Sequence, residues 1–153
     1  LEPETGIATV DDMARVKQWI VERGDRGVLN ADDPRCRAMA DALRDRRPVL
    51  VSTQSTAVEL RANSGRDDVV AVVESIEGSD WLVLHDGDAR LPLAAVGDIA
   101  STYGGRAVHN VYNALHAAAV AYLLSDSAQY VTGQTLYVDG GLTTQLTPPG
   151  KHI

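Results

Sequence analysis

Two polar segments, far apart in the chain, carry short side chains of the kind that bind the base and ribose of a nucleotide. Their candidate binding residues are Asn30, Asp32, Asp33, His109, Asn110 and Asn113. A carboxylate accepts hydrogen bonds from amino and hydroxyl groups, and a carboxamide both donates and accepts them. Such side chains can match the edge of a purine ring and the hydroxyls of a ribose. The same residue types also occur at helix starts, so the elements around them must be considered.

The first polar segment is expected where a strand ends and a helix begins. The short apolar run at residues 27–29 predicts a strand, and Pro34 favours the first turn of a helix. Open α/β sheets bind ligands at the carboxyl ends of their strands, which is where this segment would lie. A structural role remains open, because Asp32 or Asp33 could cap that helix and stabilise it by about 1 kcal/mol.

The second polar segment is expected to open a long helix over residues 110–124, apolar on nearly every face and therefore buried. Asn110 and Asn113 would share one face of this helix. Gly104 and Gly105 just before it would let the backbone approach a ligand closely. The competing interpretation is that His109 or Asn110 is only the N-cap and that the glycines form a turn.

The rest of the pattern predicts an α/β fold with a mainly parallel sheet, flanking helices and a small inserted β-hairpin region. Thr9 is expected to cap a first helix that ends near Gly24. Further predicted elements are a helix at 34–46, a strand at 48–52, β-prone runs at 69–74, 81–85 and 89–93, and a final strand at 135–138.

Composition excludes several classes of function. The chain has 153 residues and a net charge of −7, which argues against non-specific binding to nucleic acid or to anionic membranes. Its single cysteine, Cys36, excludes an internal disulfide and a cysteine-based zinc site. No apolar run approaches the roughly 20 residues that span a bilayer. We therefore expect a cytoplasmic protein with no nucleic-acid or membrane partner.

Taken together and in this order, the two segments resemble the later part of the ATP-binding central domain of Mur-type ligases, of the cyanophycin-synthetase type. The resemblance covers about residues 6–121 and extends to the stretches 11–17, 81–84 and 104–107. It implies an ATP- and magnesium-dependent ligase that forms amide bonds. By this resemblance Asn110 and Asn113 would contact the adenine, and the residues after the first strand would line the nearby wall.

The parts of that family that carry out catalysis are missing from this sequence. A phosphate loop of the form G-x-x-x-x-G-K-[ST] is absent, because neither Lys17 nor Lys151 stands in one. The magnesium-binding acid and the C-terminal domain of the family are absent too. The resemblance therefore implies a partial domain that contributes the adenine side, binds nucleotide weakly, has no catalytic or metal-binding residue and is inactive alone.

From about residue 120 to 141 the sequence resembles instead the C-terminal end of short-chain dehydrogenases. Residues 1–124 would then be the ligase-like domain and residues 125–153 the dehydrogenase-like tail. Natural recombination, assembly of the sequence from separate pieces and deliberate construction of a chimera would all explain such a join. No G-x-G occurs, and no Tyr stands four residues before a Lys, so the cofactor loop and proton-donor pair of that family are absent.

Two other functions stay open beside the ligase fragment. One is an oxidoreductase fragment derived from a short-chain dehydrogenase, and the other is a non-catalytic α/β interaction module. A second copy of the chain, or a missing upstream half of a ligase, would be its partner.

Overall fold

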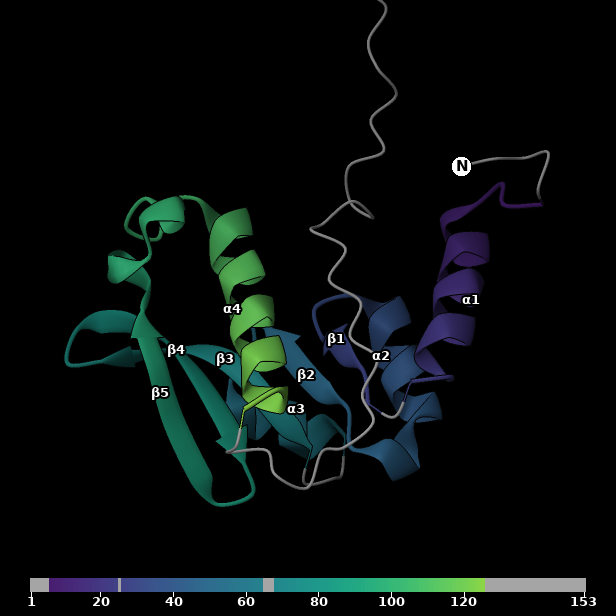
Figure 1. Ribbon diagram of the computed structural model, residues 1–153, viewed down its shortest axis with the longest axis horizontal. Coiled ribbons are helices and arrows are strands. Elements are labelled where there is room, and N and C mark those ends of the chain that lie inside the picture. The colour runs from purple at the N-terminus through teal and green to yellow at the C-terminus, as the bar shows by residue number, and fades with distance from the viewer. Residues whose placement is uncertain (1–5, 25, 65–67, 126–153) are drawn as a thin grey trace, which may run out of the picture.

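The computed structural model describes residues 6–24, 26–64 and 68–125 (Figure 1). Its elements, in chain order, are α1 (Val10–Val21), β1 (Val28–Asn30), α2 (Pro34–Ala42), the 3₁₀ helix η2 (Arg44–Arg46), β2 (Val49–Ser52), α3 (Ala57–Ser64), β3 (Val69–Ile76), β4 (Ser79–Asp86), β5 (Ala89–Ala95), the 3₁₀ helices η3 (Val96–Asp98) and η4 (Ala100–Thr102), and α4 (Val108–Leu123). The predicted strand at 135–138 and nearly all of the tail lie outside the described residues.

The five strands form one sheet in the order β1-β2-β3-β4-β5, and the prediction of a mainly parallel sheet is wrong. The pairs β1–β2 and β2–β3 are parallel, whereas β3–β4 and β4–β5 are antiparallel. The reason lies in the turns. Glu77 and Gly78 both have positive φ (52° and 82°), which suits a two-residue hairpin turn and returns the chain antiparallel beside β3. The predicted hairpin is therefore not an insertion but a continuation of the main sheet.

Helices cover both faces of this sheet, and Figure 1 shows α4 across one face with α3 behind it. Alternate residues of each strand point to opposite faces, which produces two apolar clusters. Leu50 of β2 packs with α2 and α3, while Val49 and Val51 of the same strand pack beneath α4. The α/β architecture with flanking helices is therefore confirmed.

Helix α4 is buried on one stripe only, which corrects the prediction of a helix buried on nearly every face. The buried residues are Val111, Leu115, Ala119 and Leu123. They recur every four residues because only one side of α4 meets the sheet. Its opposite side faces solvent, where Asn113, Ala117 and Ala121 are exposed. No helix in the described ranges is long and apolar enough to cross a membrane.

One predicted helix ends earlier than expected, and another helix was not predicted. The helix expected over 34–46 leaves α-helical geometry at Leu43 and continues as the short η2. Helix α3 was missed, although its sequence carries a signal. The amide of Thr56 donates to Glu59 Oε2 at 2.8 Å and the amide of Glu59 donates to Thr56 Oγ1 at 3.2 Å, a capping box that a T-x-x-E spacing predicts.

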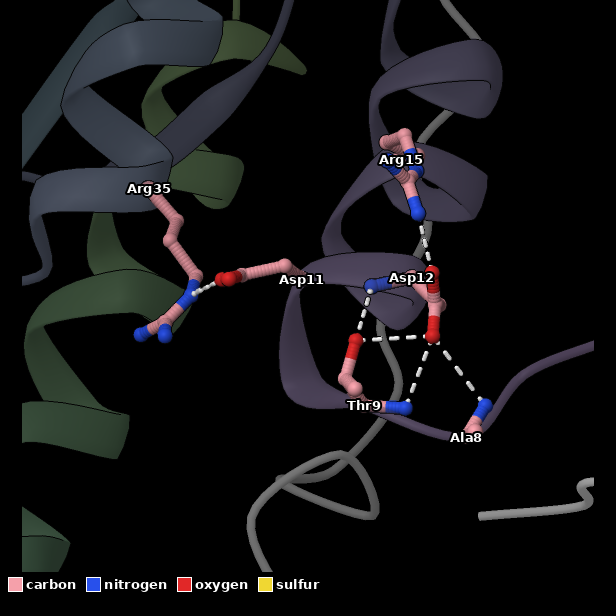
Figure 2. Close-up of polar contacts among 6 residues, drawn as sticks. All are labelled: Ala8, Thr9, Asp11, Asp12, Arg15 and Arg35. Carbon is pink, nitrogen blue, oxygen red and sulfur yellow. Dashed lines mark hydrogen bonds and ion pairs between the residues drawn. The ribbon is translucent and has the colours of Figure 1, made fainter.

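The predicted cap of α1 is confirmed and is drawn in Figure 2. The amide of Asp12 donates to Thr9 Oγ1 at 3.1 Å, while Asp12 Oδ2 accepts from the amide of Thr9 at 2.8 Å. Hydrogen bonds from Thr9, with further contributions from Arg15 and Ala8, lower the pKa of Asp12 to about 2. Asp11 accepts from Arg35 Nε of α2 at 2.6 Å, so an ion pair links α1 to the neighbouring helix (Figure 2).

Candidate functional site

The two polar segments lie at the same edge of the sheet. Asn30 ends β1 and Ser52 ends β2, so the residues that follow them share the carboxyl edge of the parallel strands. Tyr122, near the end of α4, donates a hydrogen bond to Asp86 at the end of β4. The residue before Asp86, His85, pairs with Val70 at the start of β3. The end of α4 therefore lies at the amino edge, and its first turn lies at the carboxyl edge.

Asn30 and Asp32 hold together the loops that follow β1 and β2. Asn30 Oδ1 accepts from the amide of Asp32 at 2.7 Å. Asp32 accepts from the hydroxyl of the fully buried Ser52 and, at 3.0 Å, from the amide of Thr53. Both carboxylate oxygens of Asp32 are thus engaged by the chain itself, which gives this residue a structural role.

Asp33 is the residue that caps α2. Its backbone is extended (φ −100°, ψ 124°), and its Oδ1 accepts from the amide of Arg35 at 2.7 Å, with Pro34 at the first helical position. The choice between Asp32 and Asp33 as the cap is thereby decided. One carboxylate oxygen of Asp33 serves the helix, and its side chain is partly exposed at the carboxyl edge.

The two amides of the second segment have different surroundings. Asn110 Nδ2 donates to the carbonyl of Ser101 at 2.7 Å, so this side chain is turned onto η4 and ties it to α4. His109 and Asn113 are both exposed. Neither His109 nor Asn110 caps α4, because the N-cap is Ala107 and no side chain bonds there. Of the two amides expected to contact a ligand, that of Asn110 is therefore engaged by the chain itself, whereas Asn113 is exposed.

Tyr112, which the sequence interpretation did not single out, belongs to the second segment and is close enough to the first for Asp32 and Asp33 to affect its pKa. It is half-buried, and its ring contacts that of His116 at 4.2 Å between centroids. Burial raises the pKa of Tyr112, and the nearby Cys36, Asp32 and Asp33 raise it further. Its hydroxyl therefore stays neutral and can donate a hydrogen bond. In the sequence, only its position next to Val111 in the helix could have indicated that Tyr112 lies against the sheet.

The thiol of Cys36 belongs to the same neighbourhood. Burial and the charge of Asp33 raise the pKa of Cys36, and the backbone amide of Asn30 opposes this by hydrogen bonding to the sulfur. The thiol therefore stays protonated at neutral pH, which is unlike an activated nucleophile. The carboxyl edge thus combines a carboxylate with neutral donors.

A second polar cluster, also missed, lies on the antiparallel half of the sheet. Glu74 accepts from His85 Nε2 at 2.6 Å and from Arg90 Nε at 2.8 Å. Burial opposes ionisation of Glu74, but these hydrogen bonds outweigh it and lower its pKa. The cluster joins β3, β4 and β5, and its charges are paired with one another. In the described ranges no group of three or more His, Cys, Asp and Glu could hold a metal ion.

Comparison with known families gives one match. The enoyl-(acyl carrier protein) reductase family matches residues 106–143, a segment that begins just before α4 and continues beyond it. No curated protein matches the chain. The match covers about a quarter of the sequence and includes His109, Asn110 and Asn113.

The match overturns the resemblance to Mur-type ligases and to cyanophycin synthetase. Three of the six residues on which that resemblance depended lie in a segment similar to a reductase, and nothing supports a ligase. The matched segment also runs without a break through the supposed join near residue 120. The physical reason for the error is that polar residues at a helix start occur in many unrelated folds. What the match supports is the other hypothesis, a fragment derived from a short-chain dehydrogenase.

Proposed function

We propose that the chain is a nucleotide-binding fragment of an oxidoreductase, derived from a short-chain dehydrogenase. Its ligand is a nicotinamide adenine dinucleotide, of which it holds a ribose at the carboxyl edge of β1 and β2. The observation that carries the proposal is that the half-buried Tyr112 of α4 lies within electrostatic range of Cys36, Asp32 and Asp33 at this edge, where burial and these groups raise its pKa and keep its hydroxyl neutral. In open α/β folds the carboxyl edge of the parallel strands is where nucleotides bind.

The chemistry of the two groups is complementary to a vicinal diol. Each ribose hydroxyl donates one hydrogen bond and accepts others, so an acceptor beside a donor matches it. The Asp33 oxygen that does not cap α2 is the acceptor, and the Tyr112 hydroxyl is the donor. His109 and Asn113, exposed on the first turns of α4, would lie on the outer side of the ligand. Without a glycine-rich phosphate turn in this sequence, binding is weak.

The proposal is tested by thermal unfolding of the full chain with NADH. By linkage, NADH at 100 times its dissociation constant stabilises the fold by about 2.7 kcal/mol. Asp33→Asn removes the charge but keeps a good helix cap, and Tyr112→Phe removes only a hydroxyl. We expect both variants to lose most of the response to NADH.

The matched control is Tyr103→Phe, the same chemical change at a side chain that is 74% exposed and lies before α4. This variant keeps the response of the unchanged chain. The proposal fails if both site variants respond to NADH as strongly as the control does. It also fails if ATP and NADH stabilise equally and independently of Asp33 and Tyr112.

A second candidate, a non-catalytic interaction module, is favoured by a different observation. Asn30, Asp32 and Asn110 each direct a side-chain polar atom at the chain's own backbone or side chains. Such side chains stabilise loops whether or not a ligand binds. A chain whose unfolding temperature responds to neither NADH nor ATP would support this candidate over the first.

A further inference from the structure

At the opposite end of the parallel strands, four residues form what we call the amino-edge cluster: Arg26, Arg47, Asp86 and Tyr122. Arg26 precedes β1, Arg47 precedes β2, Asp86 ends β4 and Tyr122 belongs to the last turn of α4. The cluster thus gathers side chains from four elements of the fold. It lies at the other edge of the sheet from the site proposed for nucleotide.

Asp86 is fully engaged within this cluster. Its Oδ1 lies 2.9 Å from Arg47 Nη2, and its Oδ2 accepts from the Tyr122 hydroxyl at 2.8 Å. Arg26 makes a different contact, because its Nε donates to the carbonyl of Arg47 at 2.9 Å. The acidic residue of the cluster therefore accepts from Arg47 and Tyr122, and no hydrogen bond joins it to Arg26.

Arg26 Nη2 is the unusual atom. It is buried, and no acceptor in the described part of the chain bonds to it. Leaving a buried donor unsatisfied is unfavourable, and more so for a charged group. Burial and the nearby charge of Arg47 lower the pKa of Arg26, while Asp86, Tyr122 and Asp68 partly offset this. An oxygen acceptor is the group that this guanidinium lacks.

The backbone of Arg47 is also strained. Its φ of 44° places a non-glycine residue in the left-handed region, which is unfavourable for a residue with a Cβ. Such strain persists where surrounding contacts enforce it, and it is concentrated at sites that bind ligands. Here it directs the Arg47 carbonyl to Arg26 while the Arg47 side chain reaches Asp86. That side chain is 52% exposed, so it forms the solvent side of the cluster.

We propose that the amino-edge cluster binds a small carboxylate, which accepts a hydrogen bond from Arg26 Nη2. A planar guanidinium edge matches the two oxygens of a carboxylate. The net charge of the region favours a ligand with one negative charge over a ligand with two. The carboxylates of Asp86 and Asp68 already offset part of the positive charge around Arg26, so a phosphate dianion would add more negative charge than the region can balance.

The experiment measures the unfolding temperature of the full chain at pH 7 in sodium acetate, with sodium chloride at equal ionic strength as the reference. Acetate at ten times its dissociation constant should raise the unfolding temperature by about 3–6 °C over chloride, and the rise should saturate. Arg26→Lys keeps the charge but loses the planar edge, so it should abolish the difference. Arg37→Gln, at an exposed arginine of α2, is the control and should retain it.

A second measurement keeps the proposal testable if the variants fold poorly. In the unchanged chain, the side-chain ¹⁵N resonances of Arg26 should shift along one saturable curve as acetate is added. Equal effects of acetate and chloride, or a full acetate effect in Arg26→Lys, would overturn the proposal. So would inorganic phosphate that stabilises more than acetate at equal ionic strength. Because neither arm uses a nucleotide, the result is independent of the NADH test.

Discussion

Replacing Leu115 by alanine should destabilise the protein more than any surface change, because Leu115 joins α4 to the sheet. Its side chain has no exposed surface, and it belongs to the apolar cluster that also contains Val51 and Leu84. A leucine-to-alanine change in a packed core costs about 3–5 kcal/mol when the surroundings cannot collapse into the space. The strands beneath Leu115 are held in register on both sides, so we expect a value in this range.

Urea unfolding followed by far-ultraviolet circular dichroism measures the change. For a domain of this size, each 1 kcal/mol corresponds to a shift in unfolding temperature of about 2–4 °C. The matched control is Leu124→Ala, the same substitution at a residue that is 68% exposed, and it should cost less than about 0.5 kcal/mol. If Leu115→Ala does not fold, Leu115→Val provides a milder test. Equal costs for Leu115→Ala and Leu124→Ala would show that α4 does not pack on the sheet.

Three further predictions concern polar contacts. Asn110→Ala should lower the free energy of unfolding by about 1 kcal/mol, because it removes the hydrogen bond to Ser101. Asn113→Ala, at an exposed amide, is the control and should be near neutral in the same unfolding assay. Since the pKa of Asp12 falls to about 2 on folding, from an ordinary 3.8, its contribution to stability is complete above about pH 4 and is lost as the pH falls toward 2. NMR titration of its carboxyl should show this, and Thr9→Ala should return that pKa toward 3.8. Glu74→Gln should cost less than about 1 kcal/mol, because the pairs with His85 and Arg90 are partly solvated, and a larger loss would contradict that solvation.

The starts of α1 and α2 were the most predictable features of this chain. Thr9 was expected to cap α1, and Asp33 was one of two residues expected to cap α2; both do so through bonds to backbone amides two or three residues away. Capping is local, so neighbouring residues contain all the information that it needs. The same is true of the hairpin between β4 and β5, whose two-residue turn at Gly87 and Asp88 uses the positive φ of Gly87 (55°). The T-x-x-E signal of α3 was equally local and was overlooked.

The candidate site was less predictable, because its residues acquire their roles from distant parts of the chain. Asn110 looked like a ligand-binding amide, but Ser101 of η4 takes its hydrogen bond. Asp32 looked available until Ser52 and Thr53 of the next loop were brought against it. Tyr112 had no distinguishing pattern, and its importance comes from the packing of α4 beside β1. A polar side chain can be assigned to a ligand only after its own chain has been excluded as its partner.

By itself, the amino-acid sequence determined where α1 and α2 begin, which residues alternate toward a core, and that an α/β fold forms. Tertiary structure alone decided that the sheet is mixed, that α4 buries a single stripe, and that polar groups gather at the two ends of the parallel strands. The difference is physical. Caps, turns and strand alternation depend on interactions over a few residues, whereas strand order and the environment of a charge depend on which surfaces exclude water from one another across the whole fold.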